Sequence, residues 1–354
     1  MKTNYMALKA AGHAFFRMTN QGLDHSLVRA GMERVESDAD WFPTWFATGE
    51  MLRELAEEKL AAGHAVSAGQ LLTKASLAYH FAQYLHFSEL EHKARAAASS
   101  AGCYTRALPL QRVRGQRLQV PYEGLSLPAV LRVQEAREPA PLAILVCGSD
   151  SAKEEHFNIE CELHARGLAT LSFDGPGQGE VAAQMPMHAE YHRAVAEVVG
   201  HAARLPGVDA RRIGVVGFGF GGLLAVSAAC NDPRIAACVS VSGYFDMGIM
   251  DWSDPIRAWR FAHLVGVRTL DEARQRAEQF TLDGCMDRMS RPLLVLHGGA
   301  DAGVPAEAAR RIAERAGSNA ELIEIAGGVH CFHNVSWKTT PLIGDWLVGR
   351  LTDS

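Results

Sequence analysis

The chain has 354 residues, enough for two domains of ordinary size or one large domain with an addition. Hydrophobic residues make up 48% and charged residues 21%, a balance that excludes a disordered, collagen-like or coiled-coil protein. The formal charge is −5 and the basic residues form no long run, so the sequence carries no signature of nucleic-acid binding. Glycine is in excess, 33 residues, which predicts many tight turns and close backbone approaches.

The start of the chain and its cysteines bear on location. Residues 1–10 contain no apolar core followed by a small-residue cleavage site, so we expect no secretory signal. The longest apolar stretch, 213–229, is interrupted by glycines and does not fit a membrane span. The seven cysteines are odd in number and form no C-x-x-C pair, as is typical of reduced thiols in small core positions. We therefore expect a cytoplasmic protein.

Residues 1–109 are predicted to form an all-helical domain. Apolar side chains recur at helical spacing over 45–62, with acidic side chains on the other side and Gly63 as the stop. The pattern repeats over 71–85, and a third stretch, 89–95, carries ion pairs four residues apart. Since no strand pattern interrupts these segments, the N-terminal part of the chain is expected to contain helices alone.

Residues 110–354 are predicted to form an α/β domain. A strand pair is expected at 111–121 and 125–133, after which helical stretches and short apolar strands alternate. The later strands are expected at 141–146, 168–173, 213–216, 235–242, 293–297 and 321–325. This alternation predicts a mostly parallel sheet flanked by helices on both faces. Residues 246–290 interrupt it and are expected to form a helical insertion.

Three strand ends carry the pattern of a nucleophile–acid–base site. After the strand at 213–216 comes G-F-G-F-G-G at 217–222, and the strand-turn-helix context is that of a nucleophile elbow. Asp301 and His330 follow later strands, in the order nucleophile, Asp, His that α/β-hydrolases use. Because parallel strands end at one edge of a sheet, we expect these positions to meet there.

The central elbow position, Gly219, has no side chain where Ser, Cys or Asp is expected. Glycine tolerates the strained elbow conformation, so the fold should survive. An oxyanion hole from the N–H of Phe220 and one N–H at Gly148-Ser149 would also be kept. Two explanations stay open: an active-site variant that holds substrate or product intact, or a natural member in which His330 activates water or moves a proton.

Two segments resemble a known family. C-G-S-D-S-A-K-E-E at 147–155 and D-G-P-G-Q-G-E at 174–180 closely resemble the dihydroxy-pseudo-oxynicotine hydrolases. The wider group includes fungal pigment hydrolases that shorten polyketides and bacterial fermentation/respiration switch proteins. The resemblance covers essentially the whole chain. It implies an α/β-hydrolase fold behind a helical cap and dimerisation domain, a substrate pocket between the two domains, and a homodimer.

The resemblance also implies a reaction, the hydrolysis of a carbon–carbon bond beside a ketone, or of a carboxylester in some relatives. Carried over by motif, Asp301 is the acid, His330 the base, and Gly219 stands in the place of the serine. The candidate substrate contacts are Asp150, Tyr79, His80, Tyr244, Asp246 and Trp252. The aromatic residues favour a planar or aromatic ketone, and the chemistry requires no metal or organic cofactor.

Other functions fit parts of the sequence. Positions 217–222 also match the dinucleotide fingerprint G-x-G-x-x-G, but they follow a late strand, and Asp246 lies too far on to bind a ribose. The glycine at 219 suits a non-catalytic binding protein, or a lyase or cyclase that uses His330 and Asp301. His188 and His192 have helical spacing, but the glutamate between them is misplaced for a zinc protease.

Overall fold

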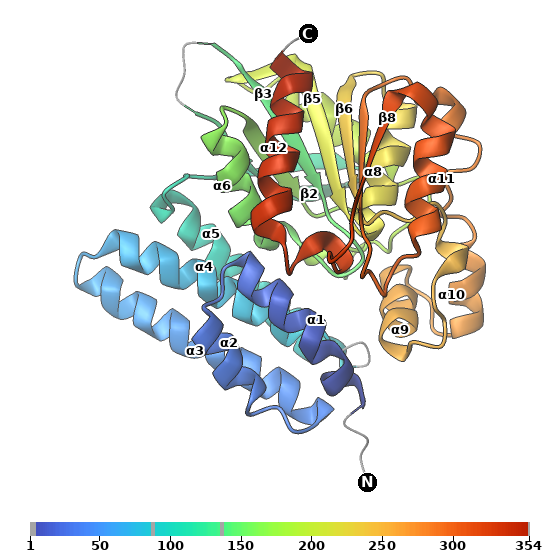
Figure 1. Cartoon of the computed structure of the whole chain (residues 1–354). Helices are drawn as coiled ribbons and strands as arrows, with labels where there is room; N and C mark the ends of the chain where they lie inside the picture. The colour runs from blue at the N-terminus through green and yellow to red at the C-terminus, as the bar shows by residue number, and fades with distance from the viewer. Residues whose placement is uncertain (1–4, 86–88, 135–137, 353–354) are drawn as a thin grey trace. The chain divides into compact units, whose positions relative to one another are not determined.

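The computed structural model describes residues 5–85, 89–134 and 138–352, and the chain divides into two compact units (Figure 1). The N-terminal unit comprises Met1–Arg117 and Glu154–Asn158, and the C-terminal unit comprises Leu118–Lys153 and Ile159–Ser354. The first boundary falls a few residues after the one expected at 109. The segment Glu154–Asn158 was not expected in the N-terminal unit, because helical periodicity does not report which distant segment a helix packs against.

In its described residues, the regular secondary structure of the N-terminal unit is helical, apart from Gln116 and Arg117 at the start of strand β1 (Gln116–Tyr122). Its helices are α1 (Tyr5–Gln21), α2 (His25–Met32), α3 (Asp38–Ala61), α4 (Ala65–Ala82), α5 (Leu90–Ala107) and the short 3₁₀ turn η1 (Leu108–Leu110). The start of α3 is fixed by Asp40, whose carboxylate accepts the Ser37 N–H at 2.8 Å. Helices α3 and α4 approach closely at Gly49, where a β-carbon would lie 2.7 Å from the Tyr79 ring.

A buried ion cluster joins the segment 154–158 to the helices of this unit. The Arg17 guanidinium donates three bonds to Glu155, at 2.7, 2.8 and 3.1 Å, and His80 Nε2 contacts the same carboxylate. All three side chains are at most 6% exposed. Because buried charges are tolerated only when they are paired, this cluster explains why 154–158 belongs with α1 and α4.

The C-terminal unit is built on one sheet, which has eight strands in the described part of the chain, ordered β1-β2-β4-β3-β5-β6-β7-β8. The strands are β1 (Gln116–Tyr122), β2 (Leu125–Arg132), β3 (Ala140–Val146), β4 (Ala169–Phe173), β5 (Val208–Phe218), β6 (Ile235–Val241), β7 (Leu293–Gly298) and β8 (Ala320–Ile325). Strand β2 runs antiparallel to β4, and the pairings from β4 to β8 are parallel. The predicted α/β-hydrolase fold class is confirmed.

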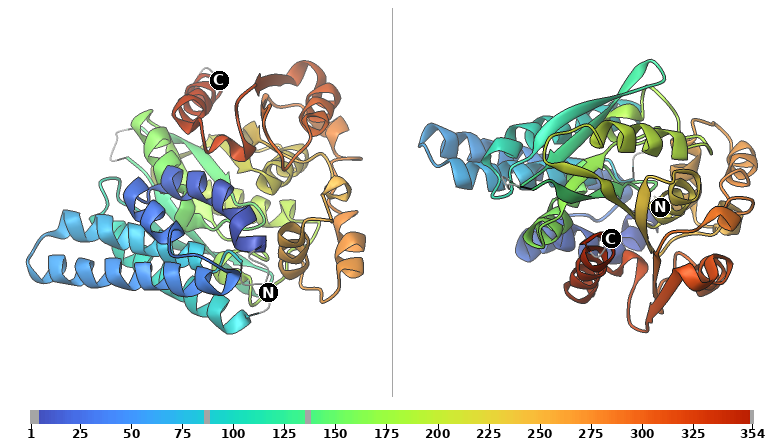
Figure 2. Two further views of the ribbon diagram at one scale, coloured as in Figure 1. Left: turned by 60° about the horizontal axis from the view of Figure 1, so that its bottom comes forward. Right: turned by 90° about the horizontal axis from the view of Figure 1, so that it is seen from above.

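Helices cover both faces of this sheet. One core contains side chains of α7 (His192–Ala202), α8 (Phe220–Asn231) and α11 (Ala306–Ala316), and the other contains side chains of α6 (Phe157–Ala165) and α12 (Ser336–Thr352). Figures 1 and 2 show α6 and α12 side by side, and Arg166 Nε donates to Asp345 at 2.7 Å between them. Strand β3 is buried along its whole length, as its unbroken apolar run predicts.

The predicted insertion at 246–290 holds two helices, α9 (Pro255–Leu264) and α10 (Leu270–Ala277), with the 3₁₀ turns η4 (Met247–Ile249) and η5 (Met286–Arg288). Pro255 occupies the first turn of α9, and the Asp254 carboxylate accepts the Ile256 N–H at 3.0 Å. Among the described residues, none of the helices has the length and apolar character needed to cross a membrane.

Candidate active site

The turn between β5 and α8 has the geometry of a nucleophile elbow with a glycine at its centre. Gly219 lies at φ 57° and ψ −122°, a conformation that L side chains rarely adopt, and its N–H donates to Val241 O at 2.8 Å. At Gly217, a β-carbon would run into the Gly221 carbonyl. Glycine beside the central position is therefore required by the sharpness of the turn.

A histidine–aspartate pair lies beside this elbow. His330 Nδ1 and Asp301 Oδ2 are 2.8 Å apart, while Asp301 Oδ1 accepts the N–H groups of Gly303 at 2.7 Å and Val304 at 3.0 Å. Burial raises the pKa of Asp301, but the hydrogen bond and charge of His330 and the two backbone donors lower it to about 2. The carboxylate is thus held in its charged form, and its hydrogen bond to Nδ1 fixes the orientation of the imidazole ring.

The other ring nitrogen of His330 faces the empty position at Gly219. An ideal β-carbon on Gly219 would lie 2.9 Å from His330 Nε2 and 3.4 Å from its Cε1. The imidazole therefore borders the space that a nucleophilic side chain would occupy. The structure brings together the three residues predicted as the catalytic set, and their roles remain predictions.

The predicted oxyanion loop follows β3 and lies against the elbow. A β-carbon on Gly148 would be 3.0 Å from Phe218 O and 3.6 Å from Gly221 N. The Gly148 N–H donates to Ser151 Oγ at 2.7 Å, which leaves Ser149 as the predicted donor of this loop. Phe220 begins α8, and the first N–H groups of a helix have no partner within it. Their oxyanion role stays a prediction.

Tyr244 and Arg257 hold the loop that carries Asp301. The buried Tyr244 hydroxyl donates to Gly303 O at 3.2 Å, and Arg257 donates to the same oxygen at 3.3 Å. Arg257 also donates to Ala302 O at 3.3 Å. Tyr244, predicted as a substrate contact, is thus placed beside the dyad, and Arg257 is a neighbour that the sequence analysis missed.

The other predicted contacts of the C-terminal unit lie in varied settings. Asp150 forms an ion pair with Arg260 of α9 at 2.7 Å, with both side chains at most 20% exposed. Asp246 pairs with Arg311 at 3.4 Å. Trp252 packs edge to face on Phe261, with ring centroids 5.9 Å apart. Their contact with substrate stays a prediction.

Tyr79 and His80, predicted as substrate contacts, have polar partners inside the N-terminal unit. The buried Tyr79 hydroxyl donates to Glu50 at 2.6 Å, and burial with this bond raises the pKa of Tyr79 above its ordinary value. His80 is buried against Glu155. These contacts account for both residues as parts of the helical packing, so a substrate role is not needed to explain them.

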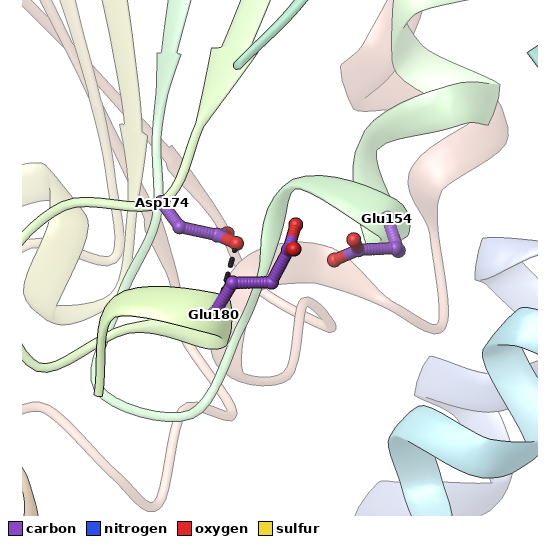
Figure 3. A group of neighbouring side chains, drawn as sticks. All are labelled: Glu154, Asp174 and Glu180. Atoms are coloured by element: carbon purple, nitrogen blue, oxygen red, sulfur yellow. Dashed lines mark hydrogen bonds between the residues drawn. The ribbon is translucent and has the colours of Figure 1, made fainter. Parts of the chain in front are cut away.

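A buried lysine cluster follows β4. Lys153 Nζ lies 2.7 Å from Asp174 Oδ2 and 2.7 Å from Glu180 Oε1, and Lys153 is wholly buried. The Glu180 N–H donates to Asp174 Oδ2 at 3.1 Å, the bond drawn between them in Figure 3. Asp174 and Glu180 are donors of a type that could hold a metal ion. Because the buried Lys153 ammonium already contacts both carboxylates, the three groups fit an internal salt-bridge cluster better than a metal site.

Two histidines considered for metal binding are not on one helix face. Helix α7 begins at His192, and His188 precedes it. His188 Nε2 lies instead 3.1 Å from the Tyr122 hydroxyl. Burial lowers the pKa of both histidines. The helical spacing seen in the sequence therefore does not pair their rings around an ion.

All seven cysteines were predicted to occupy core positions, and six of them are buried. Cys331 is the exception, since it is only partly buried and follows His330 directly. Its sulfur would lie 3.6 Å from a β-carbon on Gly219. This residue was not singled out from the sequence, and its adjacency to the predicted base, His330, is the signal that could have found it.

Comparison with known proteins agrees with this geometry. The family model described as "Esterase FrsA-like" matches residues 34–253, more than half of the chain, and that of the dienelactone hydrolase family matches residues 176–339. The chain belongs to the FrsA-like esterase family. The predicted resemblance to this group of α/β-hydrolases is confirmed.

Relatives of this FrsA-like protein are named as hydrolases. The 2,6-dihydropseudooxynicotine hydrolase of Paenarthrobacter nicotinovorans is 32% identical over 94% of this chain and 90% of that protein. The hydrolyase poxO of Penicillium oxalicum is 31% identical over 62% of this chain and 56% of that protein. The crystal structure of the 2,6-dihydroxy-pseudo-oxynicotine hydrolase matches with a TM-score of 0.88 and 30% identity, covering 96% of each chain.

Proposed function

We propose that this protein is a hydrolase that cleaves a carbon–carbon bond next to a ketone in an aromatic or polyketide-like small molecule. The observation that carries the proposal is the His330–Asp301 pair, joined at 2.8 Å, with His330 Nε2 facing position 219. A relative named for pseudooxynicotine hydrolysis, similar over nearly the whole chain, supports the substrate class. The homodimer and the pocket between domains, implied by resemblance, belong to the same proposal.

The proposed reaction needs two proton transfers, and His330 and Asp301 are placed to carry them out. His330 Nε2 accepts the proton of the attacking group and returns it to the carbon that leaves. Asp301 accepts the Nδ1–H, which fixes the tautomer and stabilises the imidazolium. The N–H groups of Phe220 and Ser149 are the proposed donors to the negative oxygen that forms at the ketone carbon. Cleavage then releases a carboxylic acid and a carbon product that carries the returned proton.

The test uses two probes with purified protein. Benzoylacetone, an aryl β-diketone, reports carbon–carbon cleavage through its acid and ketone products, and p-nitrophenyl acetate reports ester hydrolysis. We expect cleavage of the diketone, and at least a 100-fold loss in His330→Ala, because general acid–base catalysis contributes about that much. Arg29→Ala, a change in an exposed pair of the N-terminal unit, is the control and should leave the rate unchanged.

Other results would assign another function. Hydrolysis of the ester alone would indicate a carboxylester hydrolase. Conversion of the diketone without incorporation of ¹⁸O from labelled water would indicate a lyase or cyclase. Binding without turnover, both in the natural chain and in Gly219→Ser, would contradict a catalytic role and indicate a binding protein.

A further inference from the structure

Cys331 occupies an unusual place beside the predicted base. Its backbone is at φ 55° and ψ 16°, a left-handed conformation that is unfavourable for a non-glycine residue. The Cys331 N–H donates to Ser242 Oγ at 3.0 Å, and Ser242 itself lies at φ 51°. Two strained residues that bond each other hold this loop at the end of β6. This contact fixes the backbone from which the sulfur of Cys331 extends.

The thiol and the imidazole border one and the same space. The ideal β-carbon on Gly219 would lie 3.6 Å from Cys331 Sγ and 2.9 Å from His330 Nε2. A serine oxygen would extend by one further bond from that β-carbon. The sulfur thus lies within a few ångströms of the position that a serine nucleophile takes in this fold, next to the ring nitrogen that would activate it.

The charges around this space favour the protonated form of His330. Burial lowers the pKa of His330, but the charge of Cys331, hydrogen bonds to Asp301 and Cys331, and the charge of Asp301 raise it well above its ordinary value. Tyr244 and Arg257 also face the loop of Asp301, and His297 interacts electrostatically with both Asp301 and His330. A thiolate is the reactive form of cysteine, and a neighbouring protonated histidine stabilises it.

We propose that Cys331 supplies the nucleophile that position 219 lacks, so that Cys331, His330 and Asp301 form a cysteine–histidine–aspartate catalytic site. The proposal rests on the proposed hydrolase function. It depends on three groups around one space, and not on the cysteine alone. A cysteine nucleophile also explains why the His330–Asp301 pair keeps its geometry although Gly219, at the elbow, has no side chain.

The reaction balances without a cofactor. The thiol proton passes to His330 Nε2, and a sulfur electron pair bonds the ketone carbon, whose carbonyl pair moves to oxygen. When that oxygen re-forms the carbonyl, the carbon–carbon bond breaks, and the leaving carbon takes the electron pair and the proton from His330. Water then adds to the thioester, giving its proton to His330. The sulfur leaves and takes that proton back, releasing a carboxylic acid.

The first test needs no substrate. The protein is treated with iodoacetamide at pH 7, and peptide mass spectrometry follows alkylation of each cysteine. We expect Cys331 to react fastest, and at least tenfold more slowly in His330→Ala, whereas His192→Ala, a histidine of α7, should leave the rate unchanged. A Cys331 rate that is insensitive to His330→Ala would overturn the proposal.

The second test separates this proposal from the hydrolase function. Benzoylacetone and p-nitrophenyl acetate are offered to the natural chain, to Cys331→Ala and to Cys331→Ser, with thermal unfolding to verify folding. We expect at least a 100-fold loss in Cys331→Ala, and in the natural chain an acyl group on Cys331 that hydroxylamine removes.

The remaining outcomes of the second test bear separately on the hydrolase function and on the assignment of Cys331 as the nucleophile. Equal cleavage by the natural chain and Cys331→Ala would overturn the nucleophile assignment and leave the hydrolase function standing, with water as the attacking group. If the unsubstituted chain turns over neither probe but Cys331 takes up one acetyl group from p-nitrophenyl acetate, with release of one equivalent of p-nitrophenol, the hydrolase function fails and the nucleophile assignment is supported. Absence of both cleavage and acylation would overturn the assignment.

Discussion

Gly219 and Gly317 share one backbone conformation but not one environment. Gly219 lies at φ 57° and ψ −122° before α8, and Gly317 lies at φ 58° and ψ −131° after α11. A β-carbon on Gly317 would meet no atom within 4 Å, whereas one on Gly219 would lie 2.9 Å from His330 Nε2. A comparison of alanine substitutions at these two glycines therefore separates two contributions to the loss of stability. One is the cost of the backbone conformation, and the other is the cost of displacing the His330 imidazole.

We expect Gly219→Ala to destabilise the protein more than Gly317→Ala does. Each change places a side chain in a rare conformation, at a cost of about 1–3 kcal/mol. Only the change at 219 must also move His330. Urea unfolding of both variants measures the difference. Equal losses of unfolding free energy would show that the His330 side chain moves without a measurable cost in stability.

The stability that Asp301 contributes should disappear in acid. Its folded pKa of about 2 lies below its ordinary 3.8, so the contribution is present above pH 3.8 and lost as the pH falls toward 2. The shift corresponds to about 2 kcal/mol. The pKa of His330 is raised well above 6.5, so this residue stays protonated throughout the window.

Urea unfolding of the natural chain and of Asp301→Asn between pH 6 and pH 3 measures this effect. The gap in unfolding free energy should be constant above about pH 4.5 and should narrow below it. A gap that stays constant to pH 3 would contradict the lowered pKa of Asp301.

Removal of Arg17 should cost far more than removal of an exposed arginine in the same unit. Arg17→Ala leaves the buried Glu155 carboxylate without its guanidinium, which costs about 3–5 kcal/mol. Arg29 and Glu33 form an ion pair at 2.9 Å with both side chains more than 60% exposed. Arg29→Ala should therefore cost less than about 1 kcal/mol. Denaturation curves compare the two, and similar losses would contradict the buried network.

The stability effects of substitutions at Lys153 and Asp174, in the lysine cluster after β4, should be strongly coupled. Lys153→Met leaves the buried Asp174 carboxylate without its counter-charge and should destabilise the protein by several kcal/mol, on the order of a broken buried pair. The double variant Lys153→Met/Asp174→Asn removes both charges and should recover part of that loss. Strictly additive losses in a double-mutant cycle would argue against a direct ion pair.

The sheet and the dyad were predictable because their signals are local. Unbroken apolar runs mark strands such as β3, and residues directly after β7 and β8 are carried to one edge by parallel pairing. Thus Asp301 and His330 were expected together from their positions in the chain alone. The strand expected at 111 begins only at Gln116, since η1 continues the helical region to Leu110.

What escaped prediction depends on tertiary contacts. The role of Glu155 as the partner of Arg17, 138 positions away, has no periodicity that would reveal it. Burial of Lys153 runs against the usual exposure of lysine, and its two carboxylate partners come from a later loop. The left-handed conformation of Cys331, which aims its sulfur at the elbow, is likewise set by Ser242 and not by neighbouring residues in the sequence.

The membership of Glu154–Asn158 in the N-terminal unit has an evolutionary consequence. A gene fragment that encodes only residues 1–117 would leave Arg17 and His80 without the carboxylate of Glu155. The helical unit, about a third of the chain, is therefore completed only by a segment that the gene encodes within the α/β part. We expect a transplant of residues 1–117 onto another α/β-hydrolase to need a matching acid in place of Glu155.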